Sequence, residues 1–315
     1  MKNSKISNQI SNISLVILLI VSVILFSLLS DKFFTQMNIT NVLVQNIHVA
    51  VLAAAVLVLM VSGGVDLSIG YQISVASVLI AKSISVWAVP VWASILIGIF
   101  ACVIMGTFNG YLAQKLKSHT MIISLGTMAV FQGLSYLISE SKVYYNLPRS
   151  YMYIGQGRLF GWLPFNAIIF IVVLLITGYI LNKTYLGRHI YAVGDNPEAS
   201  RLAGLNVNKI KMIAYIMGGV LVGIASVLIS SRSGSADSTM GPDLTFTGIT
   251  ACVLAGVALK GGEGVLWKVI VAVFVLGVLS NGMQLVGLGT YPQYITKGAI
   301  MLISIYLSNR NMKAV

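Results

Sequence analysis

Acidic side chains are scarce in this chain, and their positions limit the chemistry that it can do. All eight lie in polar segments or at the ends of apolar ones: Asp31, Asp66, Glu140, Asp195, Glu198, Asp237, Asp243 and Glu263. Proton relays across a membrane generally need acids buried inside the spans. The positions argue strongly against a proton-coupled transporter, and weakly against a sodium-coupled one, because backbone carbonyls can also coordinate sodium.

Residues for catalysis or metal binding are equally sparse. The sequence has no P-loop, no zinc motif and no Ser/His/Asp arrangement, and Cys102 and Cys252 lie inside apolar runs without metal-ligand spacing. His48 is the one histidine within an apolar run, and it has no acid at its depth. We therefore expect no catalytic residue, no metal and no resident cofactor, so that any ATP used must bind to another subunit.

A glycine-rich segment, Val61 to Gly70, breaks an apolar run. Gly63 and Gly64 interrupt the helix that precedes them, and Asp66 can cap the helix that follows. One interpretation is a tight hairpin between two helices. The other is an unwound crossing near a permeation route, because glycine permits close approach of the backbone. These residues leave both interpretations open.

The most polar stretch of the chain, residues 183–211, predicts a short helix that docks on a protein. Asp195 or Asn196 suits the N-cap, proline suits the first helical position, and Gly204 ends the helix after about two turns. Its apolar face is small and rich in alanine, which suits a protein groove better than lipid. The candidate docking residues are Asn196, Pro197, Glu198, Ala199, Arg201, Leu202 and Gly204.

Neutral polar side chains within the apolar runs are candidates for lining a permeation route. Such residues can equally hydrogen-bond to neighbouring helices. The candidates are Gln72, Ser74, Asn109, Thr127, Gln132, Asn281 and Gln284.

The elements that must position these residues are membrane helices. Of 315 residues, 57% are hydrophobic and 9% are charged, whereas a soluble domain carries about 25% charged residues. The apolar residues come in blocks of about twenty, the length that crosses a bilayer core of about 30 Å. The sequence predicts an all-α polytopic protein whose single transmembrane domain, residues 1–315, has about ten spans: 13–30, 39–61, 67–85, 90–114, 121–139, 162–182, 212–230, 244–259, 265–286 and 291–308.

The basic residues predict the orientation of these spans. With a cytoplasmic N-terminus, thirteen of the 20 Lys and Arg residues fall on the inner side and seven on the outer side, as the positive-inside rule prefers. Both termini and the loop 183–211 are then cytoplasmic, and the loops 140–161 and 231–243 lie outside. Spans 2–5 and 7–10 enter from opposite sides, which permits an inverted repeat. The net charge of +12 is scattered, so we expect contact with the lipid membrane rather than nucleic acid.

Several motifs together resemble the ribose-type sugar permeases, the membrane subunits of carbohydrate ATP-binding-cassette importers. The resemblance covers residues 38–308 in consistent order, with departures at His119, Met121 and Ser124. It rests on Gly63–Gly70, Gly106–Leu112, Ser124–Thr127, Leu186–Ile210, Val253–Gly256, Lys260–Gly264, Asn281–Gln284 and Tyr291–Lys297.

The resemblance implies a permease of the plasma membrane (inner membrane) that translocates a monosaccharide. Its partners would be an ATPase subunit that docks at residues 183–211, an extracytoplasmic sugar-binding protein, and a second copy or homologous permease. The outer loops would receive the binding protein at Glu140, Lys142, Asp237 and Asp243, with Arg149 nearby. The alternatives are a permease for branched-chain amino acids, from a related branch, and an ion-coupled secondary transporter.

Overall fold

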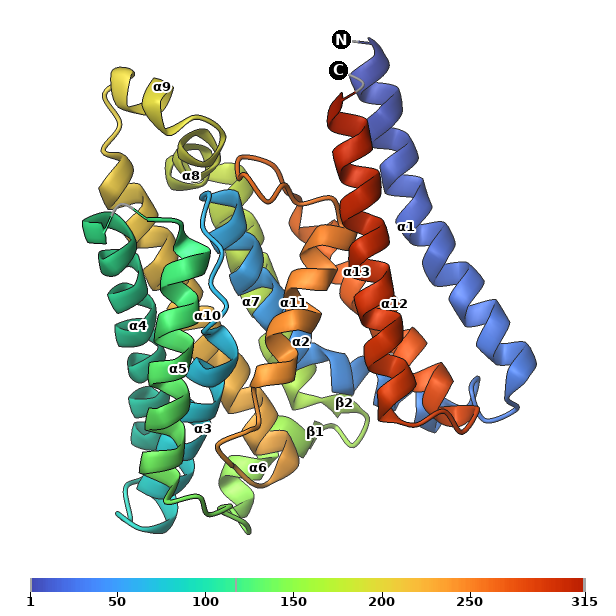
Figure 1. The fold of residues 1–315 in the computed structure, drawn as a ribbon. Helices are drawn as coiled ribbons and strands as arrows, with labels where there is room; N and C mark the ends of the chain where they lie inside the picture. The colour runs from blue at the N-terminus through green and yellow to red at the C-terminus, as the bar shows by residue number, and fades with distance from the viewer. Residues whose placement is uncertain (1, 117, 314–315) are drawn as a thin grey trace.

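The chain forms a helical bundle with one short β ribbon in a computed structural model (Figure 1). The structure describes the backbone of residues 2–116 and 118–313, and the side chains of residues 15–116 and 118–306. The elements in these ranges are α1 (Lys2–Leu29), α2 (Gln36–Val61), α3 (Ile69–Ser85), α4 (Val91–Leu116), α5 (Thr120–Ser139), α6 (Arg149–Gln156), β1 (Arg158–Leu159), β2 (Leu163–Pro164), α7 (Phe165–Lys183), α8 (Tyr185–Asp195), α9 (Pro197–Leu202), α10 (Val207–Ser233), α11 (Pro242–Leu254), α12 (Leu266–Leu285) and α13 (Thr290–Lys313). The predicted all-α class is confirmed, since the two strands of the antiparallel ribbon have two residues each.

The central helix is α2, because it is apolar on every side. Its residues 47–61 are buried, and the side chains from Ala50 to Ala55 are completely covered. A helix that is hydrophobic all round belongs in an interior. The helices α7, α10, α11 and α12 pack around it, and the run of small alanines lets them approach closely.

Six helices are long and apolar enough to cross a membrane, judged by length and composition over the described residues: α2, α4, α5, α7, α10 and α12. The apolar parts of three others are shorter, namely Leu15–Leu29, Ile69–Ser85 and Pro242–Leu254. At 1.5 Å per residue, α11 extends about 20 Å, less than the bilayer core of about 30 Å. Residues 67–85 and 244–259, expected as full spans, therefore form shorter helices that are preceded by irregular backbone.

The two ends of the bundle carry different elements (Figure 1). The first turns of α1, the last turns of α13, and α8 with α9 lie at one end, whereas α6 and the β ribbon lie at the other. The loop 183–211 and the loop 140–161, which the sequence places on opposite sides of the membrane, thus lie at opposite ends of the molecule.

Two helices in the polar loops were missed by the sequence analysis. The loop 183–211 contains α8 as well as the predicted short helix, and the loop 140–161 contains α6. The N-cap of α8 is Thr184, whose hydroxyl accepts from the backbone N–H of Gly187 at 3.2 Å. This threonine, three residues before the glycine of the Leu-Gly-Arg motif, was the available signal for a helix start.

Candidate functional site

A buried polar network surrounds the carboxylate of Asp66 at the start of α3. The Oδ1 atom accepts from the backbone N–H and the hydroxyl of Ser68 at 2.8 and 2.6 Å. The Oδ2 atom accepts from the amides of Gln72 at 3.1 Å and Asn109 at 2.8 Å. Asp66 is 4% exposed. It therefore ties the start of α3, through three hydrogen bonds, to α4, through one. Ser68, not Asp66, occupies the N-cap position of α3.

The segment between α2 and α3 is irregular rather than a tight hairpin. Residues 62–68 leave the end of α2, where Gly63 has a φ of +81°, and descend into the bundle before α3 begins (Figure 1). The backbone N–H of Val65 donates to the hydroxyl of Thr120 on α5 at 2.9 Å. A Cβ added to Gly64 would lie 3.0 Å from the hydroxyl oxygen of Tyr215 on α10. Side chains from several helices thus fix this break in place.

The starts of α3 and α11 meet inside the bundle. The backbone N–H of Gly241 donates to the hydroxyl of Ser74 at 3.1 Å. A Cβ added to Gly70 would lie 2.7 Å from the carbonyl oxygen of Gly241 and would overlap the Thr245 hydroxyl. Only glycine at these positions allows such proximity. Both helices therefore bring the positive ends of their dipoles to one region.

The predicted route residues separate into two groups. Four are buried and bonded to the protein: Gln72 and Asn109 bind Asp66, Ser74 binds Gly241, and Thr127 donates to the carbonyl of Ser124 at 3.3 Å. These contacts match the alternative that polar groups join helices.

The second group of route residues is accessible. Gln132 is half-buried on α5. Asn281 and Gln284, on α12, line a polar cavity of about 240 Å³ together with Gln45 and Arg232. Asn281 also exchanges two hydrogen bonds of 2.9 Å with Asn38 on α2. This cavity had no counterpart in the sequence analysis, because its walls come from five separate helices.

The segment α8–α9 carries the predicted docking residues. The side chain of Asn196 accepts from the backbone N–H of Ala199 at 2.9 Å, which confirms the N-cap and the helix that starts at Pro197. Arg201 pairs with Glu198, and Leu202 is 80% exposed. The seven predicted docking residues are all exposed: Asn196, Pro197, Glu198, Ala199, Arg201, Leu202 and Gly204.

Glycines join α8 to two loops of the bundle. The backbone N–H of Gly262 donates to the carbonyl oxygen of Val61 at 2.9 Å. A Cβ added to Gly194 in the last turn of α8 would overlap this same carbonyl oxygen, and one added to Gly261 would lie 2.7 Å from the Cα of Gly63. We call Gly63, Gly194, Gly261 and Gly262 the glycine junction. It connects the segment before α9 to the loops that follow α2 and α11.

Comparison with known proteins gives a consistent family. Residues 38–305 match the family model described as "Branched-chain amino acid transport system / permease component". The chain is 32% identical over 294 residues to a ribose import permease of Bacillus subtilis (strain 168), covering 93% of this chain and 91% of the relative. The chain belongs to the ribose-type sugar permeases. No solved structure matches it significantly.

Other relatives of this permease have different sugars in their names. An L-arabinose transport system permease of Escherichia coli (strain K12) is 34% identical over 264 residues, 83% of this chain and 79% of the relative. A fructose import permease of Rhizobium meliloti is 30% identical over 297 residues, 92% of this chain and 82% of the relative. These relatives favour a sugar importer over a permease for branched-chain amino acids.

The predicted docking residues of the permease for a binding protein lie in two places. Glu140 forms ion pairs with Lys82 at 3.0 Å and Lys142 at 2.8 Å, and the carboxylate of Asp237 accepts from the backbone N–H of Thr239 at 2.7 Å. Residues 144 and 236 form a β-bridge that joins the two loops predicted to lie outside. Asp243 lies instead on the first turn of α11, where it accepts from the hydroxyl of Tyr294.

Charge reversal at Glu140 is expected to weaken docking of the binding protein. Hydrogen bonds from Lys142 and then Lys82 lower the pKa of Glu140 from 4.5 to about 2. Because this pKa is lower in the folded than in the unfolded state, the stability contributed by ionised Glu140 is complete above the unfolded pKa and is lost as pH falls through about 2. Glu140 therefore stays ionised between pH 5 and 8, and its effect on docking should not change with pH in this range.

The measurement is ATP-driven uptake at increasing concentrations of the sugar-loaded binding protein. Glu140→Lys should raise the concentration needed for half-maximal uptake, because three cations would then face each other, while the maximal rate stays the same. Glu140→Gln is the control that removes the charge without reversing it. An unchanged concentration dependence for Glu140→Lys would remove Glu140 from the docking surface.

Proposed function

We propose that this permease forms half of the membrane channel of an ATP-driven monosaccharide importer, with α9 as the helix that docks on a separate ATPase subunit. The observation that carries the proposal is the exposed, capped α9 at the end of the bundle opposite α6 and the β ribbon. Its exposed Leu202 offers an apolar contact and its Glu198–Arg201 pair offers polar ones. A short helix with one small apolar contact is suited to a groove in a partner.

The orientation and number of spans belong to the same proposal. The end with α8, α9 and both termini faces the cytoplasm, in agreement with the distribution of basic residues. Ten segments cross or enter the membrane, with α3 and α11 as helices of partial length. The second copy or homologous permease would complete the channel, and the binding protein would dock on the joined outer loops.

An inverted repeat of spans 2–5 and 7–10, that is α2–α5 and α10–α13, is supported by the two irregular segments. Residues 62–68 precede α3 in the first set, and residues 234–241 precede α11 in the second. The starts of both short helices meet within the bundle. Short or broken helices in corresponding positions of two halves are typical of transporters that bind substrate between repeats.

The transport cycle follows from the contacts of α8. Closure of the ATPase subunits on ATP would push α9, and the glycine junction would pass this movement to the loops after α2 and α11. The first of these loops leads to the start of α3, which touches the start of α11, and the second follows the end of α11. Packed elements of this kind move as rigid bodies between two states rather than deforming gradually.

The proposed function is tested by purifying the tagged permease from mildly solubilised membranes and identifying what accompanies it. An ATPase subunit and a sugar-binding protein should be recovered, and vesicles containing the complex should take up ribose, L-arabinose or fructose only with ATP. Recovery of the chain alone, with uptake driven by an ion gradient without ATP, would instead make it a secondary transporter.

Changing Arg201 to glutamate should uncouple ATP hydrolysis from uptake. Arg201 is exposed on α9 and pairs only with Glu198 among the described residues, so folding should be unaffected, but a docked partner would meet a reversed charge. We expect uptake to fall by about tenfold or more, as for a like-charge contact at an interface, while insertion stays normal.

The matched control for this prediction is Arg188→Glu on α8. Arg188 is exposed on α8, where its guanidinium carbon lies 4.5 Å from the centre of the Tyr185 ring. Uptake and ATP hydrolysis are measured in the same vesicles. Equal loss in both variants would mean that the charge of the whole cytoplasmic end matters, and that α9 is not the docking element.

A further inference from the structure

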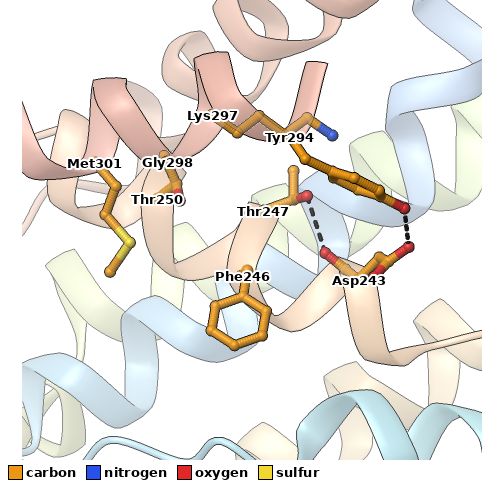
Figure 2. A pocket seen from close by; sticks show the side chains of 8 residues that line it. All are labelled: Asp243, Phe246, Thr247, Thr250, Tyr294, Lys297, Gly298 and Met301. Atoms are coloured by element: carbon orange, nitrogen blue, oxygen red, sulfur yellow. Dashed lines mark hydrogen bonds between the residues drawn. The ribbon is translucent and has the colours of Figure 1, made fainter. Parts of the chain in front are cut away.

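Two neighbouring cavities of the permease share two of their lining residues. The polar cavity described above lies between α2, α10, α11, α12 and α13, and the second cavity lies between α11 and α13 (Figure 2). Each has a volume of about 240 Å³, and both are lined by Thr247 and Lys297. Together they fall in the range of roughly 300–1,000 Å³ that is typical of small-molecule sites.

The first cavity contains hydrogen-bonding groups that the protein leaves without partners. The side chains of Gln45, Gln284, Gln293, Arg232 and Lys297 line it. None of them makes a side-chain hydrogen bond or ion pair with another described residue. Arg232, Gln293 and Lys297 are half-buried, whereas Gln45 and Gln284 are exposed. Half-buried polar groups are normally satisfied by protein, water or ligand, so the three around this cavity favour a polar occupant.

The second cavity adds an acceptor and two aromatic rings (Figure 2). The carboxylate of Asp243 binds the hydroxyl of Tyr294, and its backbone carbonyl accepts from the hydroxyl of Thr247 at 3.0 Å. Phe246 is 63% exposed and Tyr294 is 45% exposed. Sugars present both hydroxyl groups and apolar C–H faces, so carboxylates, amides and aromatic rings are suitable partners for them.

We propose that the two joined cavities form one binding site for a neutral monosaccharide in the permease. Arg232 and Lys297 donate to its hydroxyl oxygens, Asp243 and the amide oxygens accept from its hydroxyl groups, and Phe246 covers one face. The lining carries charges of both signs, and a neutral polyol can bond to both. This site rests on the proposed function, whose cargo it holds.

The position of the site fits a step early in import. Its residues come from the first half of α2, the last turn of α10, the second half of α12, and the first turns of α11 and α13. These parts lie away from α8 and α9, toward the end that carries α6 (Figure 1). A sugar released by the binding protein would reach this site from that end.

Accessibility of a single cysteine tests the site in the complete transporter. A Cβ added to Gly298, in the wall of the second cavity, meets open space, so Gly298→Cys places a thiol there without a clash. The native Cys102 and Cys252 are fully buried and should not react. In vesicles, ribose, L-arabinose or fructose at about ten times its Kd should slow labelling by a thiol reagent roughly tenfold.

The matched control is Gly289→Cys in the loop before α13. A Cβ at Gly289 also meets open space, and this residue does not line either cavity. Its labelling should be the same with and without sugar. Equal labelling of Gly298→Cys with and without a sugar that the wild type imports would overturn the site. Protection only by ribose 5-phosphate would overturn the assignment to a neutral sugar.

A second variant separates binding from folding. Lys297→Met keeps the length of the side chain but removes its ammonium group, and should raise the KM for the imported sugar about tenfold or more, because a charge-assisted hydrogen bond is lost. Lys115→Met, at the exposed end of α4, should keep the wild-type KM. If the wild type imports none of the three sugars, the proposed function itself fails. If the wild type imports one and Lys297→Met keeps its KM, only the binding site fails.

Discussion

Replacing Asp66 with alanine is expected to destabilise the permease by several kcal/mol and to abolish transport. The change removes the acceptor of four hydrogen bonds in a buried site. The N–H and hydroxyl of Ser68 lose their acceptor, and the amides of Gln72 and Asn109 keep only the Ser68 hydroxyl. Each buried donor left without a partner costs about 1–3 kcal/mol. The start of α3 would lose its attachment to α4. Thermal unfolding of the purified protein and sugar uptake in vesicles measure the two effects.

Asparagine at position 66 should be much milder than alanine. It keeps one oxygen for the N–H of Ser68, and its new amide can donate to the Oδ1 atom of Asn109, which has no partner in the described structure. Asp31→Ala is the control on an exposed acid, with a change in unfolding free energy within about 0.5 kcal/mol. If Asp66→Ala unfolds like Asp31→Ala, the network does not stabilise the break between α2 and α3.

Replacing Gly194 with alanine should separate ATP hydrolysis from transport. The added methyl group would overlap the carbonyl oxygen of Val61, which also accepts from the N–H of Gly262. The last turn of α8 must then move away from the end of α2, at a cost of about 1–3 kcal/mol. We expect hydrolysis to continue in the complex and uptake to fall at least tenfold, a loss that corresponds to about 1.4 kcal/mol of coupling.

Gly178→Ala in the middle of α7 provides the control for a glycine in a helix. Its added methyl group would make an ordinary contact of 3.5 Å with Leu266. Uptake per ATP hydrolysed is the quantity to compare, together with the amount of complex recovered. If Gly194→Ala loses hydrolysis and uptake equally, the junction serves assembly; if it retains both, the junction does not transmit movement.

The two predictions concern successive parts of the chain of contacts that leads from α9 to the start of α3. The glycine junction links the segment before α9 to the loops after α2 and α11, and the Asp66 network holds the far end of the first of these loops. Loss of the network should therefore reduce stability as well as transport, whereas loss of the junction should mainly reduce transport. This difference in readout distinguishes a structural role from a role in coupling.

Much of this protein follows from local sequence. Membrane insertion is determined by the length and density of the apolar runs, which only helices can form in lipid. The short helix at Pro197 follows from Asn196 before it and Gly204 after it, because capping depends on residues within a few positions of each other. The family is evident from motifs whose residues are adjacent in the chain.

The tertiary structure decided which polar groups are accessible. Gln72, Asn109 and Asn281 are all amides within apolar runs, but two of them bind Asp66 and one lines a cavity. Their sequence contexts do not distinguish them, because their partners lie on other helices. The cavity itself combines Gln45 with Lys297 from opposite ends of the chain, and the glycine junction combines the end of α8 with two loops. Such contacts depend on how helices pack, which local patterns of residues do not specify.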